Sequence, residues 1–442
     1  MPKILILDIY RETPYRISKD TSGGYGTGND FGEGLIPYLL KKRLKYLSDW
    51  PPLFAAYTHS ILKENYETVD FKKINNFKEI EDEIENYDYF VIVSSIVCCE
   101  TELSLIEELF KRKKKCVAIG PFSTNKPELY LNSGASVIIG EPEAFFSKEK
   151  ISDISLSPKK ISVNSQIDIN SLPFPKWNIL LNLSKIKLYG NYKTVPILGT
   201  RGCPYSCFRY CVYPLQQGRV VRQRTPSNIF KEIEYWHKTF GVELFIFRDP
   251  VFSINKKHTK ELCDIIVNSN IKIKFVIETH LRLLDEDLLN NLKNAGLVFV
   301  KVGIENADED ILYNEKRFSV KKDEQLNKIL LLKKKKIGIS AMYILGFPTD
   351  NEDSIKRTIS YAIKLNTEFA QFSIWTPYPG TPVFNDFKNS ITVKTYEGFD
   401  QYRLTFKHKN LTYDQLRNFL SLAYKNYYLR VSWMINYFFK KN

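Results

Sequence analysis

Short apolar strands alternate with helical segments along most of this 442-residue chain. In the N-terminal third, buried strands are predicted at 3–9, 67–71, 89–93, 116–119 and 136–139, the second of them weaker than the rest. Near-continuous apolar strands separated by helices are typical of a parallel sheet with helices on both faces. We therefore expect an α/β protein whose residues 1–147 form a Rossmann-like, doubly wound parallel sheet.

The same alternation continues through a second region, in six strand–helix units. Their strands are predicted at 195–199, 243–247, 273–277, 297–302, 342–345 and 371–375. Polar residues follow several of these strands, and barrel enzymes build their active sites at the carboxyl ends of strands. Residues 187–390 are therefore predicted to form a partial (β/α)6 barrel, preceded by a proline-containing linker at 148–186 and followed by a helical region at 391–442.

Three cysteines, Cys203, Cys207 and Cys211, lie between the first barrel strand and the next helix. The glycine and prolines around them favour a loop. Iron–sulfur clusters usually take four cysteine ligands, so three thiols leave one iron open for a substrate or cofactor, as in catalytic zinc sites. Two alternatives remain at this point: one buried helix face, since the spacing is i, i+4 and i+8, or a zinc site completed by a distant histidine.

The other four cysteines, Cys98, Cys99, Cys116 and Cys263, are expected to be core residues because they lie on predicted strand ends or helix faces. Seven cysteines in so long a chain do not indicate a disulfide framework, which favours a reducing, cytoplasmic compartment. No run approaches the roughly 20 apolar residues of a membrane span, and a charge comes too early for a secretion signal.

The net charge of +14 raises the question of a nucleic-acid partner. Lysines are scattered through nearly every predicted helix, and no recognisable nucleic-acid module accompanies them. A nucleic-acid partner is therefore not expected, and an acidic small molecule or a lipid head group suits the charge equally well.

The cysteine loop resembles the cluster loop of the radical SAM superfamily, whose [4Fe–4S] cluster binds S-adenosylmethionine (SAM) through its open iron. That family usually spaces its cysteines by three residues and then two, with an aromatic residue before the third. Tyr210 occupies the aromatic position, whereas the second gap of this chain has three residues. The resemblance implies that Cys203, Cys207 and Cys211 are the cluster ligands.

The resemblance also implies contacts to SAM at the strand ends of the barrel. Tyr210 would support the adenine, and the backbone near Gly346 would meet its edge. Asp249 occupies the place that meets the methionyl amino group, and Glu305 and Asn306 the segment that meets the ribose. Carboxylates can accept hydrogen bonds from an ammonium or from hydroxyls, although each could also be an ordinary capping or ion-paired group.

The ends of the N-terminal strands carry small residues, in an order that resembles the cobalamin-binding domain preceding many radical SAM cores. Ser94 and Ser95 follow one strand, Gly120 the next, and Gly140 and Glu141 the last. In that family, small residues here let the nucleotide tail of cobalamin lie against the backbone. Ordinary strand-to-helix turns are the alternative, because glycine and serine are turn residues in any case.

Two other N-terminal features bear on this interpretation. The Asp-x-His-x-x-Gly motif is absent, since Asp8 is followed by Ile9 and Tyr10 and the only histidine in this third is His59, so no lower histidine ligand is predicted. The glycine-rich stretch 23–32 fails the dinucleotide spacing and is expected to lie over the ligand at the sheet edge.

The resemblance implies a cobalamin-dependent radical SAM enzyme that transfers a methyl group to an unactivated carbon or phosphorus. Its cofactors would be a [4Fe–4S] cluster, SAM and cobalamin, and its partners a small-molecule or lipid substrate and an external flavodoxin- or ferredoxin-type electron donor. A cyclase or rearrangement enzyme and a non-catalytic cobalamin or iron–sulfur sensor are the alternatives. No catalytic residue is assigned, and His280 and Arg282 could either face the substrate or be structural.

Overall fold

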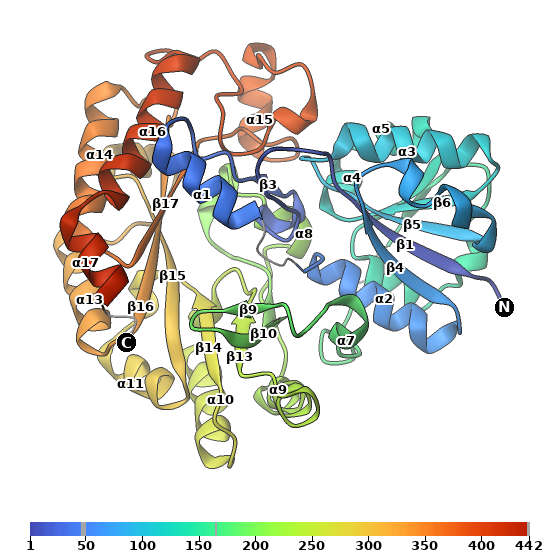
Figure 1. Cartoon of the computed structure of the whole chain (residues 1–442), viewed down its shortest axis with the longest axis horizontal. Helices are drawn as coiled ribbons and strands as arrows, with labels where there is room; N and C mark the ends of the chain where they lie inside the picture. Colours follow the sequence, from blue (N-terminus) through green and yellow to red (C-terminus); the bar gives the residue numbers. More distant parts are fainter. Residues whose placement is uncertain (46–49, 164–165, 440–442) are drawn as a thin grey trace.

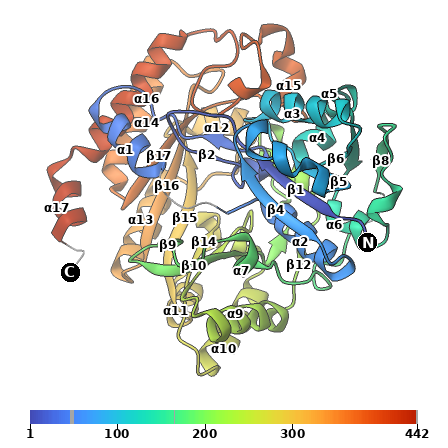
Figure 2. The same cartoon turned by 45° about the vertical axis from the view of Figure 1, so that its right-hand side comes forward.

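The computed structural model describes residues 1–45, 50–163 and 166–439 (Figure 1). An N-terminal sheet and a larger curved sheet lie side by side, each with helices packed against it (Figures 1 and 2). This arrangement confirms the predicted α/β class, with a doubly wound sheet followed by a partial barrel and a helical tail. Of the predicted linker and tail, residues 164–165 and 440–442 lie outside the described residues.

The N-terminal sheet has six parallel strands in the order β4-β1-β5-β6-β7-β8. The strands are β1 (Ile4–Ile9), β4 (Val69–Ile74), β5 (Tyr89–Val93), β6 (Lys115–Ile119), β7 (Ala135–Ile139) and β8 (Lys160–Ser162). The chain order reverses beside β1, and ligands of such sheets bind beyond the carboxyl ends near this reversal. β8 lies within the 148–186 segment and pairs with β7 through Ile138 and Ile161.

Helices cover both faces of this sheet. They are α2 (Leu53–Asn65) and α6 (Pro142–Phe146) on one face, and α3 (Cys99–Lys111) and α5 (Pro127–Ser133) on the other. α2 is buried without interruption from Leu53 to Leu62. Such a helix has no polar stripe, so its sequence lacks the helical periodicity by which an amphipathic helix is found, and α2 was not predicted.

The curved sheet runs in the order β17-β16-β15-β14-β13-β10-β9, and only β9 is antiparallel to its neighbour. Its strands are β9 (Lys187–Leu188), β10 (Tyr192–Ile197), β13 (Leu244–Phe247), β14 (Lys274–Glu278), β15 (Leu297–Glu305), β16 (Gly338–Leu345) and β17 (Phe369–Ile374). The six parallel strands correspond to the six predicted units. Along β16 and β17 buried and half-buried residues alternate, so one side of each strand meets the helices and the other lines the barrel interior.

Helices follow the barrel strands and lie outside them (Figure 2). These are α9 (Pro226–Phe240), α10 (Lys256–Asn268), α11 (Glu286–Asn294), α12 (Glu309–Asn314), α13 (Lys322–Lys334) and α14 (Glu352–Leu365). Helix α9 begins at a capped turn: the Thr225 side chain accepts a hydrogen bond from the Asn228 amide at 3.2 Å, with Pro226 in the first turn.

The C-terminal region packs against the last barrel strand. Helix α16 (Tyr413–Tyr428) places Tyr424 and Tyr428 so that their hydroxyls donate to the Phe372 and Ala370 carbonyls of β17, at 2.8 and 2.7 Å. α17 (Val431–Phe439) follows. None of the helices in the described parts of the chain is long and apolar enough to cross a membrane.

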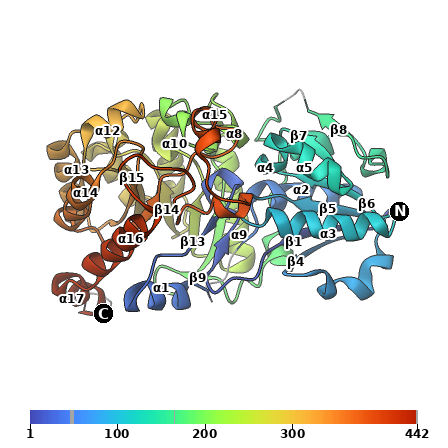
Figure 3. The same ribbon diagram turned by 90° about the horizontal axis from the view of Figure 1, so that it is seen from above.

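The glycine-rich segment lies between the two sheets, at the centre of the view from above (Figure 3). Its Tyr25 hydroxyl donates to the Pro379 carbonyl beyond the barrel at 2.7 Å. Just before it, Lys19 is fully buried and donates to Glu102 at 2.8 Å and to the Val93 carbonyl of β5 at 2.9 Å. The segment is therefore joined to both halves of the molecule.

Candidate functional site

The cysteine loop begins and ends at a two-stranded neck above the barrel. β11 (Thr200–Arg201) pairs antiparallel with β12 (Arg222–Gln223), and Arg201 lies opposite Arg222. Gly202 follows with φ of +92°, and a Cβ there would lie 2.1 Å from the Val220 carbonyl oxygen. Only glycine permits this close approach, so Gly202 sets the entry into the loop.

The cysteine segment is a loop and not one continuous helix. Cys203 precedes a short 3-10 turn, Ser206–Arg209, which contains Cys207, and Cys211 follows before α8 (Tyr213–Gln217). The alternative of a single buried helix face is therefore wrong. Cys203 and Cys207 are buried, and Cys211 is half-buried.

The thiols and one arginine interact with one another. Arg317 donates to the Cys207 sulfur at 3.7 Å. A hydrogen bond from the Cys211 thiol and the charge of Arg317 lower the pKa of Cys207 to about 6, whereas burial raises the pKa of Cys203. The same hydrogen bond raises the pKa of Cys211, so Cys207 is the most readily deprotonated of the three thiols, and thiolates are the form that binds metal.

The donor set of this loop fits an iron–sulfur cluster. Within residues 1–45, 50–163 and 166–439, no three histidine, cysteine or acidic side chains converge on a point where one metal ion could sit. A [4Fe–4S] cluster is larger than a single ion and takes its thiolates around its periphery, so its cysteines need not converge in that way. The three thiols, a lowered thiol pKa and the neighbouring Arg317 suit such a group.

Glu305 lies beside the thiols at the end of β15. It accepts from Arg317 Nη2 at 3.1 Å, and the same guanidinium donates to the Gly303 carbonyl at 3.2 Å. Glu305 has φ of +70°, directly after a register shift between β15 and β16. Non-glycine residues in this region are uncommon and cluster at functional sites. Burial raises the pKa of the Glu305 carboxyl.

Tyr210 belongs to the same cluster. Its ring meets Phe347 edge-on at 5.9 Å, and burial and the Glu305 carboxylate raise the pKa of its hydroxyl. Among the described residues that hydroxyl has no hydrogen-bond partner, although it is buried. The structure thus brings together Tyr210, Glu305 and the cysteines. The sequence did not indicate Arg317, which lies in a polar stretch without a motif.

Asn306 and Gly346 are joined by a residue that the sequence analysis missed. Asp350 Oδ2 accepts from the Gly346 and Phe347 amides, both at 2.9 Å, and Asn306 Nδ2 donates to the same carboxylate at 3.4 Å. Asn306 Oδ1 accepts from the Thr358 hydroxyl at 3.0 Å. These bonds hold the ends of β15 and β16 in register. An aspartate soon after a Gly-Phe-Pro turn was the available signal.

Asp249 supports the strand that leads into the neck. Its Oδ1 accepts from the Gly199 amide at 2.7 Å, while among the described residues Oδ2 has no partner. Burial raises the pKa of Asp249 to about 7. One oxygen of the Asp249 carboxylate is therefore bound to the backbone, and the other is available for the predicted contact to the methionyl amino group.

His280 and Arg282 pack on the outer side of the loop. The His280 ring lies 5.5 Å from that of Tyr205, and one ring nitrogen is 2.6 Å from the Phe318 carbonyl oxygen. Arg282 is exposed and lies over the Phe318 ring at 4.2 Å. Burial lowers the pKa of His280 to about 4, so its imidazole is neutral near pH 7.

A pocket lies where the carboxyl edge of the N-terminal sheet meets the cysteine loop. Its lining comes from both halves of the molecule and includes Asp20, Gly23, Gly24, Phe54, Gly120, Gly140, Glu141, Glu143, Arg201, Tyr213, Gln217 and Arg248. The glycine-rich segment therefore lies at the sheet edge, as expected. The cysteine loop itself forms part of the wall.

The predicted cobalamin residues divide into two groups. Gly120, Gly140 and Glu141 line the pocket. Ser94 and Ser95 do not line it: the Ser94 hydroxyl donates to Ser123 at 2.9 Å and the Ser95 hydroxyl to Glu102 at 2.8 Å. Their partners, Ser123 and Glu102, are separated from them in the chain, so the sequence did not indicate these hydrogen bonds.

At Gly120, which carries no side chain, the pocket wall presents backbone. Gly120 has φ of +117°, and a Cβ there would lie 2.8 Å from the Phe54 ring and 2.9 Å from the Ser94 hydroxyl. Glu143 is fully buried, and among the described residues its Oε2 has no hydrogen-bond partner. His59 lies on the buried part of α2 with its ring 6.4 Å from that of Phe71, away from the residues that line the pocket.

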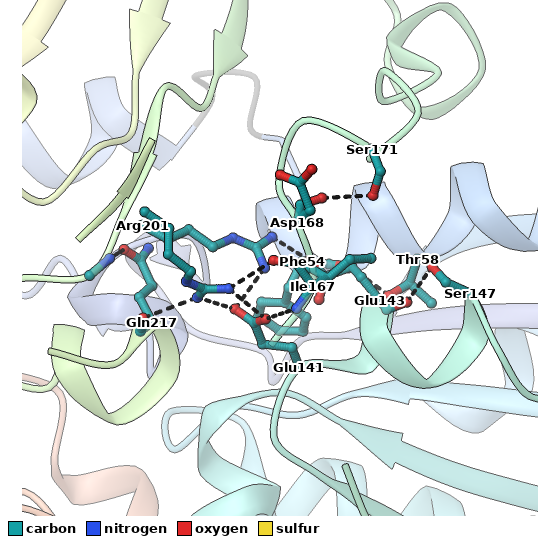
Figure 4. A network of polar contacts seen from close by, with 12 residues as sticks. Phe54, Thr58, Glu141, Glu143, Ser147, Ile167, Asp168, Ser171, Arg201 and Gln217 are labelled. Atoms are coloured by element: carbon teal, nitrogen blue, oxygen red, sulfur yellow. Dashed lines mark hydrogen bonds and ion pairs between the residues drawn. The ribbon is translucent and has the colours of Figure 1, made fainter. Parts of the chain in front are cut away.

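Glu141 and Glu143 bind the neck of the cysteine loop through two arginines, an arrangement that we call the clasp (Figure 4). Arg201 donates to Glu141 at 3.0 Å and to Glu143 at 2.5 Å. Arg222 donates to both oxygens of Glu141, at 2.9 and 2.5 Å. Although burial alone would raise the pKa of Glu141, the Arg222 hydrogen bond and the Arg201 charge hold it below its usual value.

Comparison with known proteins gives one family and several relatives. Residues 197–362 match the radical SAM superfamily. The chain is 26% identical over 431 residues to an uncharacterized methyltransferase of Pyrococcus horikoshii, covering 88% of this chain and 90% of the relative. It is also 26% identical over 380 residues to a bacteriochlorophyllide d C-12(1)-methyltransferase of Chlorobaculum tepidum, with 83% and 80% covered.

A solved structure shares the fold. The radical S-adenosylmethionine methyltransferase TsrM from Kitasatospora setae, with cobalamin and a [4Fe–4S] cluster bound, superimposes with a TM-score of 0.58 at 14% identity. The match covers 88% of this chain and 75% of that one. The likeness extends over both sheets, so the order of a Rossmann-like sheet and then a barrel is shared.

The clasp can be tested by removing its central carboxylate. We expect Glu141→Ala to destabilise the protein by about 3 kcal/mol, because it leaves two largely buried arginines short of a partner. Glu128→Ala removes an exposed ion pair with Lys160 and should cost less than about 1 kcal/mol. Urea unfolding compares the two variants, and amide exchange of residues 199–224 should rise only in Glu141→Ala. Equal effects would contradict the clasp.

The buried Asp249 predicts a pH dependence. The pKa of Asp249 is about 7 in the folded protein and about 3.8 in the unfolded chain, so folding takes up a proton at pH values between these two. The contribution of this carboxyl to the free energy of unfolding is therefore lost as the pH rises toward and through 7. Relative to Asp249→Asn, the wild type should lose up to about 1.4 kcal/mol per pH unit between pH 5 and 7. Urea unfolding across this range measures the difference, and parallel profiles would refute it.

Proposed function

We propose that this chain, which carries a radical SAM domain over residues 197–362, is a cobalamin-dependent radical SAM enzyme that transfers a methyl group to an unactivated carbon or phosphorus. One observation carries the proposal: the cysteine loop is also a wall of the pocket at the sheet edge, through Arg201, Tyr213 and Gln217. A cluster on the loop and a cofactor in the pocket would therefore be neighbours. The methyltransferase names of the relatives support the same reaction class.

The cysteines would hold a [4Fe–4S] cluster, with the Cys207 thiolate favoured by the Cys211 hydrogen bond and by Arg317. When bound, the cluster, SAM and cobalamin supply one-electron cleavage of a sulfonium and a methyl donor, which are chemistries that protein side chains lack. The widened second gap places Phe208, Arg209 and Tyr210 between Cys207 and Cys211. Phe208 and Arg209 belong to the turn Ser206–Arg209, and Tyr210 after it contacts Phe347.

The strand-end residues would orient SAM. The Glu305 carboxylate can accept hydrogen bonds from the ribose hydroxyls, and its position is held by Arg317. The free oxygen of Asp249 can accept from an ammonium group. Gly346, fixed by Asp350, presents backbone beside Tyr210 and Phe347, where an adenine could stack or hydrogen-bond.

The substrate would enter the barrel interior, whose wall carries both polar and apolar groups. Half-buried Ser340, Met342, Gln371 and Ser373 alternate with buried residues along β16 and β17. This lining suits a small molecule or a lipid-like group. A cytoplasmic location and an external reductant complete the proposal.

The test is anaerobic reconstitution with iron, sulfide and cobalamin, followed by SAM and a strong chemical reductant. We expect 5′-deoxyadenosine from the wild type and only background from Cys207→Ala, because the cluster loses a ligand. Cys263→Ala, at a buried cysteine of α10, is the matched control and should retain the product and the iron content. Product from Cys207→Ala at the wild-type rate would disprove the cluster assignment.

Isotope-labelled SAM separates methyl transfer from the alternatives once a substrate is found. A labelled SAM methyl group should appear in the product, as measured by mass spectrometry. A product without label, together with 5′-deoxyadenosine, would indicate a cyclase or rearrangement enzyme. A fully loaded protein that forms no 5′-deoxyadenosine with substrate present would favour the sensor.

A further inference from the structure

The outer side of the cysteine loop carries three exposed cations, Arg219, Arg282 and Lys316. With the exposed side chains Val220, Tyr313 and Phe318 they form a surface that we call the basic face. We propose that the basic face is the docking surface for a small acidic electron-carrier protein of the flavodoxin or ferredoxin class. The inference rests on the proposed function, in which the cluster must receive one electron from outside.

Arg219 lies directly on the residues between the cysteines. Its guanidinium lies 4.3 Å from the Phe208 ring and donates to the Pro204 carbonyl at 2.9 Å. Pro204 and Phe208 each follow a cysteine immediately. This positive charge is therefore adjacent to the backbone that would surround the cluster.

Lys316 and Arg282 reach the loop from the barrel side. The Ser206 hydroxyl donates to the backbone carbonyl of Lys316 at 3.2 Å. Arg282 lies over Phe318, whose ring is parallel to that of Tyr205 at 6.4 Å. Arg219 and Lys316 thus contact the cysteine loop directly, at Pro204, Ser206 and Phe208, and Arg282 reaches Tyr205 through Phe318.

The charge of the basic face is not neutralised within the chain. In the parts of the chain that the structure covers, Arg219, Arg282 and Lys316 form no ion pair. Most carboxylates close to them in the chain have other partners: Asp285 pairs with Lys256, Glu286 with Lys335, Asp287 with Lys260, and Glu315 and Asp386 with Arg209. The exposed Glu309 and Asp310 of α12 are the exceptions. An acidic partner would therefore supply the missing negative charge.

The apolar side chains of this surface suit a transient protein contact. Val220 is 67% exposed, Phe318 43% and Tyr313 82%, and the Tyr313 carbonyl accepts the amide of Lys316 at 2.9 Å. Weak electron-transfer complexes use small interfaces, and a few apolar contacts ringed by charge provide enough affinity without slowing release.

Position favours this face over the other side of the loop. Residues of the basic face contact Pro204 and Ser206, which lie between Cys203 and Cys207, so the loop would separate a carrier on this face from the cluster. The opposite side, through Tyr213 and Gln217, already belongs to the pocket. In the transfer, the carrier's reduced flavin or iron–sulfur centre loses one electron and the cluster gains it, with no other bond changed.

Charge reversal tests the proposal on the reconstituted full chain. Arg282→Glu/Lys316→Glu reverses two charges of the basic face and keeps the backbone carbonyl of Lys316 that Ser206 binds. Lys272→Glu/Lys364→Glu is the matched control. Lys272 and Lys364 are exposed at the amino ends of the barrel strands, away from the loop. Stopped-flow absorbance follows cluster reduction by an acidic flavodoxin hydroquinone and, separately, by dithionite.

We expect the double reversal to slow reduction by flavodoxin about 10-fold or more at low salt, because electrostatic steering changes association rates by such factors. Reduction by dithionite and iron content should match the wild type, and the control variant should behave as wild type with both reductants. Raised salt should slow the wild type toward the rate of the double reversal.

Two results would overturn the proposal. One is a double-reversal variant that flavodoxin reduces as fast as the wild type at low salt, and the other is a wild-type rate that does not respond to salt. Failure of the proposed function is distinguishable, because it would appear as a wild-type protein that binds no cluster or makes no 5′-deoxyadenosine with dithionite.

Discussion

The neck of the cysteine loop is held to the N-terminal half by two arginines, which lie opposite each other on β11 and β12 and bind Glu141 and Glu143 just beyond β7. Removing one member of a buried ion pair is strongly destabilising, and here Glu141 accepts from both arginines and from the Ile167 amide. This small contact area therefore fixes the position of the loop relative to both the barrel and the N-terminal sheet. The pocket and the thiols share this wall, so their relative position depends on the clasp.

Within the barrel, backbone geometry at the strand ends is held by charges. Arg317 joins Glu305, Gly303 and Cys207, and so links the unusual φ of Glu305 to the thiol whose pKa it lowers. At the end of the next strand, β16, Asp350 fixes the backbone by accepting a hydrogen bond from the Gly346 amide. Strained backbone persists only where its surroundings over-determine it, and these two networks provide that support before any cofactor is considered.

Much of the fold could be predicted because parallel strands covered on both faces are continuous apolar runs. β5 and β6 were predicted within one residue, and all six parallel barrel strands were found. α2 was missed because burial on every side removes helical periodicity, and β9 because it has only two residues. The extension of the sheet by β8 depends on pairing with β7, which no local pattern of Lys160–Ser162 indicates.

The sequence by itself determined the chemistry that is available: three thiols in a glycine- and proline-bounded loop, and polar residues after apolar strands. These properties are local and follow from residue type and spacing. Only the tertiary structure decided which groups meet, because hydrogen bonds and ion pairs form between residues distant in the chain. In the folded chain, Ser94 and Ser95 form hydrogen bonds with Ser123 and Glu102. Glu141 forms ion pairs with Arg201 and Arg222, and Arg317 donates to the Cys207 sulfur.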